Sequence, residues 1–302
     1  MIGYCCINTT LESQGIRVNR GMVKKTFLER GLSYAAELAL LNFLDIEKIL
    51  IWNLQNNIMV YRISSDSFPW MSEYQIEQLP NFEKIAAQLN KIGNIIKQNG
   101  IRVSYHPGPF NVLSSPREEV VRKTIKELNQ HSQIFDLMGL DNSPLYPINI
   151  HIGNTKPSIQ ESAKKFCQSF DLLSPKTQRR LTVENDDSSN QFSVQELYQL
   201  IYKNIQIPIV FDQHHHNLGK QDLSLMDALN LSLSTWGNIK PLTHRSSSKK
   251  IEDSKSVAKA HADYIYEPII QGFIEFDTEI EAKKKELAVL KYFKDFQNLL
   301  TT

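Results

Sequence analysis

The chain has 302 residues, 41% of them hydrophobic and 22% charged, and its formal net charge is only +1. This composition is that of a globular protein, and the length suits a single α/β barrel. The near-zero charge excludes a strongly basic nucleic-acid-binding protein, although divalent ions bound in one cleft would make that cleft locally positive.

The cysteines and the apolar runs indicate the cellular setting. Of the three cysteines, Cys5 and Cys6 are adjacent, which is no disulfide framework, so a reducing compartment fits best. The amino terminus lacks the basic stretch of a secretory signal, and there is no run of about 18 apolar residues to span a membrane. We therefore expect a soluble, intracellular monomer with no membrane partner.

Short apolar runs alternate with longer amphipathic segments along the chain. Strands are predicted at 2–7, 48–52, 101–106, 146–153, 179–186, 207–212, 238–244 and 272–281. Helices are predicted at 21–46 (broken near Gly31), 82–100, 116–140, 158–173, 193–204, 223–233 and 282–300. The segment 53–81 is too long for a tight connection and is expected to form an excursion at the barrel mouth. These alternations predict a closed, parallel (β/α)₈ TIM barrel, one catalytic domain over residues 1–302.

Imidazole and carboxylate side chains stand at or just after most predicted strand ends. In a barrel these ends open on one face, so residues far apart in sequence converge there. Of the eight histidines only His131 lies mid-helix, where we expect it to pack. A mixed set of this size suits two or three ions of Zn²⁺, Mn²⁺ or Fe²⁺. The candidate ligands are His106, His151, Glu184, Asp212, His215, His244, His261 and Glu281.

Each candidate also has a simpler interpretation. His106 and His151 could be histidines hydrogen-bonded within turns, and His214 and His216 are not both expected to be ligands. Glu184 is harder to explain in this way, because a carboxylate at the end of an apolar strand needs a partner. The coincidence of so many such residues at strand ends favours a metal centre.

Several short motifs follow one another in a specific order over most of the chain. They are GYCCIN (3–8), YRISSDSFP (61–69), RVSYHPGPFNVL (102–113), HSQIFDLMGL (131–140), INIHIGN (148–154), LTVENDD (181–187), FDQHHH (211–216), THRSS (243–247), HADYI (261–265) and EAKKKELAVL (281–290). Together they resemble the UV damage endonuclease family, relatives of the endonuclease IV fold.

The resemblance implies a cluster of two or three divalent ions, with Mn²⁺ favoured and Zn²⁺, Mg²⁺ or Co²⁺ as alternatives. Carried over residue by residue, it implies that His106, His151 and Glu184 hold the first ion. The residues that the resemblance makes catalytic are Glu184, His244 and Glu281.

The other ligands follow from the same resemblance. Glu184 is implied to bridge to a second ion held by Asp212, His244 and Glu281. A third ion is implied at the remaining two histidines, His215 and His261.

The positions expected to touch the damaged duplex match the family only in part. Tyr4 and Asn8 match positions near the lesion or the cut strand. Pro109 replaces a glutamine that probes the duplex, whereas Phe110 keeps an aromatic side chain that can wedge into it. Leu242 replaces a lysine that the family ties to its metal site, which bears on the third ion.

The resemblance implies a metal-dependent endonuclease that cuts duplex DNA on the 5′ side of UV photoproducts, both cyclobutane dimers and 6-4 photoproducts, and leaves a 3′-hydroxyl. Abasic sites are possible further substrates. The basic residues singled out for contact with phosphates are Arg245, Lys249, Lys250 and Lys156.

Two other functions stay open on the sequence alone. Metal-dependent sugar isomerases and epimerases also place Glu, Asp and His at the strand ends of related barrels. A catalytically decayed protein that binds damaged DNA without cutting it would fit Leu242 and Pro109.

Overall fold

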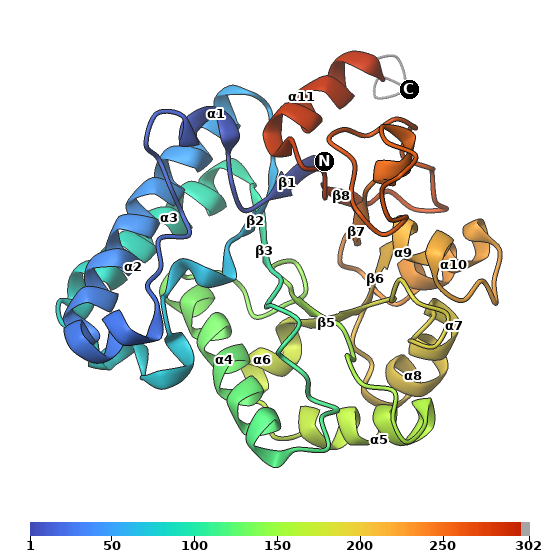
Figure 1. Ribbon diagram of the computed structural model, residues 1–302, viewed down its shortest axis with the longest axis horizontal. Coiled ribbons are helices and arrows are strands. Elements are labelled where there is room, and N and C mark those ends of the chain that lie inside the picture. The colour runs from blue at the N-terminus through green and yellow to red at the C-terminus, as the bar shows by residue number, and fades with distance from the viewer. Residues whose placement is uncertain (297–302) are drawn as a thin grey trace.

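Eight parallel strands pair in sequence order and close into a barrel in the computed structural model, which describes residues 1–296 (Figure 1). The predicted TIM-barrel fold is confirmed. The strands are β1 (Ile2–Cys5), β2 (Val60–Ile63), β3 (Arg102–Tyr105), β4 (Ile148–Ile150), β5 (Leu181–Glu184), β6 (Ile209–Asp212), β7 (Leu242–Arg245) and β8 (Asp277–Ile280).

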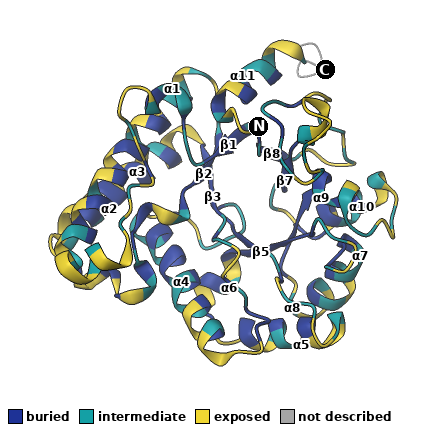
Figure 2. Ribbon diagram, viewed as in Figure 1, coloured by how far each residue is buried: buried dark blue, intermediate teal, exposed yellow. Residues whose placement is uncertain are grey.

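Helices surround the barrel and bury the sides that face it (Figure 2). In α3, for example, Ile85, Leu89, Ile92 and Ile96 recur at helical spacing and are all fully buried. None of the helices within residues 1–296 is both long and apolar enough to cross a bilayer. The helices are α1 (Thr9–Glu12), α2 (Lys24–Gln55), α3 (Phe82–Asn99), α4 (Glu118–Leu137), α5 (Ile159–Phe170), α6 (Pro175–Arg180), α7 (Val194–Leu197), α8 (Lys203–Ile205), α9 (Gln213–Leu218), α10 (Leu225–Ser234) and α11 (Lys285–Asp295).

The second strand is not where the sequence pattern put it. The apolar run 48–52 continues α2, where Ile49 and Leu50 are buried and Lys48 pairs with Asp45 at 2.7 Å, one turn earlier. The strand is instead Val60–Ile63, inside the segment assigned to the excursion. A short apolar run fits a buried helix as well as a strand, so periodicity could not separate the two.

The other elements lie closer to their predicted residue ranges. The break in α2 falls at Gly31, whose φ of 61° is the left-handed conformation that glycine tolerates. Residues 64–81 do form an excursion after β2, built of three short 3₁₀ turns. His131 is buried in α4, as expected. The last predicted helix begins at Lys285, and its residues 297–300 lie outside the described part of the chain.

The interior of the barrel is unusually polar. Alternate residues of β8 point inward, so Asp277 and Glu279 are buried and Glu281 follows at the mouth. Across the barrel, Ser104 of β3 donates a hydrogen bond to Glu279, and the next inward position of that strand is His106. Two strands that are not neighbours in the sheet thus carry polar side chains up to the mouth.

Candidate metal centre

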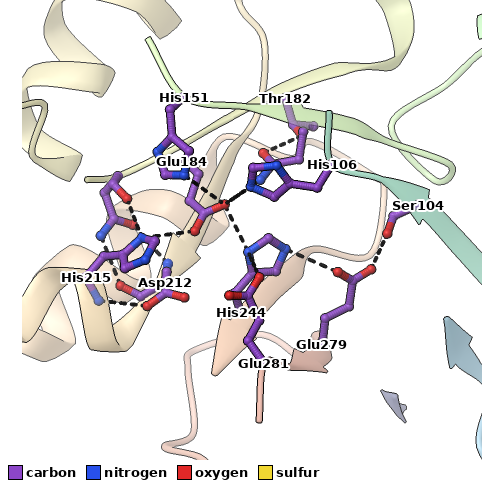
Figure 3. Close-up of polar contacts among 12 residues, drawn as sticks. Ser104, His106, His151, Thr182, Glu184, Asp212, His215, His244, Glu279 and Glu281 are labelled. Atoms are coloured by element: carbon purple, nitrogen blue, oxygen red, sulfur yellow. Dashed lines mark hydrogen bonds and ion pairs between the residues drawn. The ribbon is translucent and has the colours of Figure 1, made fainter. Parts of the chain in front are cut away.

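Glu184 lies at the centre of the polar residues that meet at the barrel mouth (Figure 3). It is the last residue of β5, and the ends of β3 and β4 bring His106 and His151 to it. One of its carboxylate oxygens, Oε2, is 3.0 Å from His106 Nε2 and 3.8 Å from His151 Nε2. The ligand atoms of these three residues lie within 4.8 Å of one another, so they could hold a metal ion.

A second group forms where β6 runs into α9. Asp212 ends the strand and caps the helix, because its carboxylate accepts a hydrogen bond of 2.7 Å from the backbone N–H of His215. This turn brings the His215 ring to Glu184, with Nδ1 3.1 Å from Oε1. Glu184, Asp212 and His215 are therefore a second set of ligand atoms within 4.8 Å, and Glu184 belongs to both sets.

A buried carboxylate oxygen that accepts no hydrogen bond indicates that these ligand atoms suit a cation. Asp212 Oδ2 is buried and accepts no hydrogen bond from any residue between 1 and 296. A buried carboxylate oxygen without a donor is costly, and a divalent ion removes that cost. Mixed imidazole and carboxylate ligands are typical of sites for Zn²⁺, Mn²⁺ or Fe²⁺.

His244, near the end of β7, contacts Glu184 from the interior of the barrel. Its Nδ1 is 3.0 Å from Glu184 Oε2 and 3.5 Å from Glu281 Oε1. His261 is farther out, with Nδ1 3.8 Å from Glu281 Oε2. The resemblance groups His244 and Glu281 with Asp212, whereas the structure groups Asp212 with His215.

Two buried residues beneath the mouth were missed by the sequence reasoning. Arg62 of β2 donates to Glu279 through Nε at 2.7 Å, and its Nη1 lies 2.6 Å from Glu281 Oε1. Glu279 Oε2 is also 3.3 Å from His244 Nε2. The alternation of Glu279 with Glu281 along β8 was a usable signal, but Arg62 lay in the segment that was not read as a strand.

The carboxylates and the imidazoles around Glu184 stabilise one another's charged forms. Burial of Glu184 would by itself raise its pKa, but the imidazoles of His244 and His151 outweigh it and hold that pKa well below its usual range. Burial disfavours a charged ring at His215 and at His244, yet nearby carboxylates raise their pKa values to about 11 and about 10. These rings carry protons that a metal ion would displace.

The expected wedge residue stands free at the mouth. Phe110, on the loop after β3, has 88% of its surface exposed. Its neighbour Pro109 lines a cavity of about 280 Å³ together with His151 and His215. An exposed aromatic side chain beside the cavity that the candidate metal ligands line is available to contact a substrate.

Two of the four basic residues chosen from the sequence are engaged within the protein. Arg245 is buried and pairs with Glu267 at 3.1 Å. Lys249 lies 2.5 Å from Glu252 and 2.8 Å from Asp263. These two are structural ion pairs, while Lys250 and Lys156 are exposed.

Tyr4 and Asn8 are buried. Tyr4 has no exposed surface and Asn8 only 1%. The Tyr4 hydroxyl donates to Asn53 at 2.8 Å and accepts from the Asn8 side chain at 2.9 Å. In this structure the pair ties the end of β1 to α2, and its place beside the DNA stays a prediction.

Leu242 fills space inside the barrel. It is fully buried against Val60, Val210 and Trp236. The nearby Lys240 does not substitute for the missing lysine, because its amine is 3.0 Å from Asp277, below Glu279 on the same strand.

Comparisons with known proteins show which family the chain resembles. The family model described as UV-endonuclease UvdE matches residues 1–301. The UV DNA damage endonuclease of Clostridium perfringens (strain 13 / Type A) is 31% identical over 312 residues, which cover 100% of this chain and 72% of that protein.

Solved structures give the same result for the fold. The crystal structure of SacUVDE superposes with a TM-score of 0.86 at 31% identity, covering 100% of this chain and 99% of that one. The 3-keto-D-glucoside 4-epimerase YcjR from E. coli has a TM-score of 0.54 at 13% identity, covering 87% and 95%. The second likeness shows a shared barrel alone.

Proposed function

The chain belongs to the UV-endonuclease UvdE family, and we propose from this membership that it is a metal-dependent DNA repair endonuclease. Its substrate is duplex DNA that carries UV photoproducts, cyclobutane dimers or 6-4 photoproducts. It cuts the phosphodiester immediately 5′ to the lesion and leaves a 3′-hydroxyl. Abasic sites are secondary substrates.

The observation that carries the proposal is the shared position of Glu184 in two ligand sets. His106 and His151 would hold one ion, Asp212 and His215 a second, and Glu184 would bridge them. Divalent ions in such a site lower the pKa of water and stabilise the charge that develops in phosphodiester cleavage. Mn²⁺ is the ion that we propose first for these ligands.

The surrounding side chains orient the ligands. Asp186 Oδ1 lies 2.9 Å from His151 Nδ1, on the side of the ring away from Nε2, which is 3.8 Å from Glu184 Oε2. Asn149 donates to Glu184 Oε2 at 2.5 Å. His244 and Glu281 complete the ring of groups around the reacting phosphate.

Lesion recognition rests on Phe110. A photodimer stacks poorly, so unstacking it costs less free energy than unstacking normal bases. An aromatic ring with 88% exposure can occupy the space that a displaced base leaves. Pro109 cannot donate a hydrogen bond at the neighbouring position, so selectivity here depends on shape and deformability.

The test uses four duplexes of one sequence that differ only in the lesion: a cyclobutane dimer, a 6-4 photoproduct, an abasic site or none. We expect Mn²⁺-dependent incision of the damaged duplexes and at most trace cutting of the undamaged one. Tight binding to the damaged duplexes without incision, in Mn²⁺-loaded protein, would indicate a decayed binder. Absence of both binding and incision would contradict the proposal.

A further inference from the structure

We propose that a basic groove leading away from the metal centre, across the loops that follow β3 and β4, binds the phosphate backbone of one DNA strand beside the lesion. This inference rests on the proposed function and adds to it the path of the DNA. We call this surface the β3–β4 groove. It leads towards α4 and α5, the green and yellow-green helices of Figure 1.

The groove consists of three adjoining cavities. The first, of about 280 Å³, is the one lined by His151 and His215. The second, of about 640 Å³, shares Pro109 and Asn111 with the first. The third, of about 270 Å³, shares Asn154 and Pro116 with the second. Neighbouring cavities therefore share lining residues from the candidate ligands to α5.

Hydrogen bonds between the two loops hold the floor of the groove. Asn154, after β4, donates to the carbonyl oxygen of Ser114, after β3, at 3.2 Å. Ser114 in turn donates to the carbonyl oxygen of Ile152 at 2.7 Å. Asn111 donates to Glu127 of α4 at 2.8 Å, which engages that carboxylate within the protein. Such a floor keeps its shape when a ligand binds.

The basic side chains gather at the end of the groove away from the candidate ligands, whereas Asp186 and Asp187 line the first cavity and Glu161 lines the third. Arg117 and Lys123 line the second cavity, and Lys156, Lys164 and Lys165 line the third. Lys123 pairs with Glu119 of its own helix at 3.3 Å. Within residues 1–296, none of the other four has a carboxylate within 4.0 Å.

These free cations contrast with the basic residues on the β7 side of the mouth. Arg245 and Lys249 are committed to Glu267, Glu252 and Asp263. Unpaired basic side chains in a row are the electrostatic footprint of nucleic acid. Phe110 also lines the second cavity, so an aromatic ring stands between the metal centre and the basic end. A strand whose lesion contacts Phe110 would place its flanking phosphates on the lysines.

The experiment measures how DNA binding depends on salt. The groove variant is Lys156→Gln with Lys164→Gln and Lys165→Gln. The matched control removes three exposed lysines from segments that precede strands, at the opposite end of the barrel: Lys97→Gln, Lys176→Gln and Lys203→Gln. Both variants lose the same net charge, and circular dichroism checks that both are folded.

Dissociation constants for a duplex with one cyclobutane dimer are measured from about 50 to about 250 mM KCl, a range over which phosphate contacts change the affinity strongly. Each neutralised phosphate contributes about 0.9 to the slope of log K against log salt. We expect the slope of the groove variant to fall by about two to three, and that of the control to match wild type. Incision by the control at low salt is expected to match wild type, whereas incision by the groove variant is expected to weaken in step with its DNA binding.

An unchanged slope in the groove variant, with wild-type binding and incision intact, would overturn the inference and leave the proposed function standing. Failure of wild type itself to bind or cut damaged DNA would overturn both. A further variant, Arg117→Gln, extends the test along the groove, where we expect its slope to fall by about one.

Discussion

Arg62 lies between the two inward carboxylates at the end of β8, with its Nε 2.7 Å from Glu279. Its Nη1 is 2.6 Å from Glu281. All three groups are buried or nearly so, and buried ion pairs stabilise a fold only when every member stays paired. Their position beneath His244 gives them a second role, to fix the side chains that border Glu184.

The variant Arg62→Met tests whether Arg62 stabilises the two carboxylates of Glu279 and Glu281. In Arg62→Met, Glu279 and Glu281 lose their common cation, so we expect the free energy of unfolding to fall by about 3–5 kcal/mol. Urea unfolding of EDTA-treated protein measures it. The matched control is Lys91→Met, which removes an exposed lysine that pairs with Glu47 (2.8 Å) and should cost at most about 1 kcal/mol. Equal losses in the two variants would refute a special role for Arg62.

Glu184→Gln tests the bridge between the two ligand sets. The amide keeps the shape of the side chain but offers one neutral oxygen in place of two charged ones. We expect the Mn²⁺ content to drop and single-turnover incision to fall by about 100-fold or more. Mass spectrometry of bound metal and a gel assay measure the two effects. Glu37→Gln, on the outer side of α2, is the control, and near wild-type incision by Glu184→Gln would be incompatible with the site.

Phe110→Ala tests the wedge. Stacking of a base on an aromatic side chain is worth about 1–3 kcal/mol, so the ratio of affinities for damaged and undamaged duplex should fall about fivefold or more. Metal content should not change, because Phe110 offers no ligand atom. Phe273→Ala, another exposed aromatic, serves as the control. Equal weakening on damaged and undamaged DNA would rule out the wedge role.

Binding of a metal ion should stabilise the folded protein. At Mn²⁺ concentrations about 100 times the dissociation constant, mass action adds about 2.7 kcal/mol to the stability. For a chain of this size we expect the melting temperature to rise by about 5 °C. Differential scanning fluorimetry with Mn²⁺ or EDTA measures the shift, and a shift of the same size in Glu184→Gln would place the bound ion elsewhere.

The sequence predicted the barrel, and it predicted which candidate ligands would meet at its mouth, because both depend on local signals. Each strand end that carries a candidate ligand follows a short apolar run, and the fold itself brings these ends together. The prediction failed at 48–52, where an apolar run continues a helix and hides β2. Arg62 was missed with that strand. The grouping of Asp212 with His215 depends on the capping hydrogen bond of α9, which is tertiary geometry that spacing does not encode.

The most direct measurement is the position of the nick in a duplex with one cyclobutane dimer, labelled at either end of the damaged strand and incubated with Mn²⁺ or with EDTA. A cut immediately 5′ to the dimer, with a 3′-hydroxyl on the upstream fragment, is expected with Mn²⁺ and not with EDTA. Cutting that persists in EDTA, or no cutting by folded, Mn²⁺-loaded protein, would contradict a metal-dependent endonuclease built around Glu184.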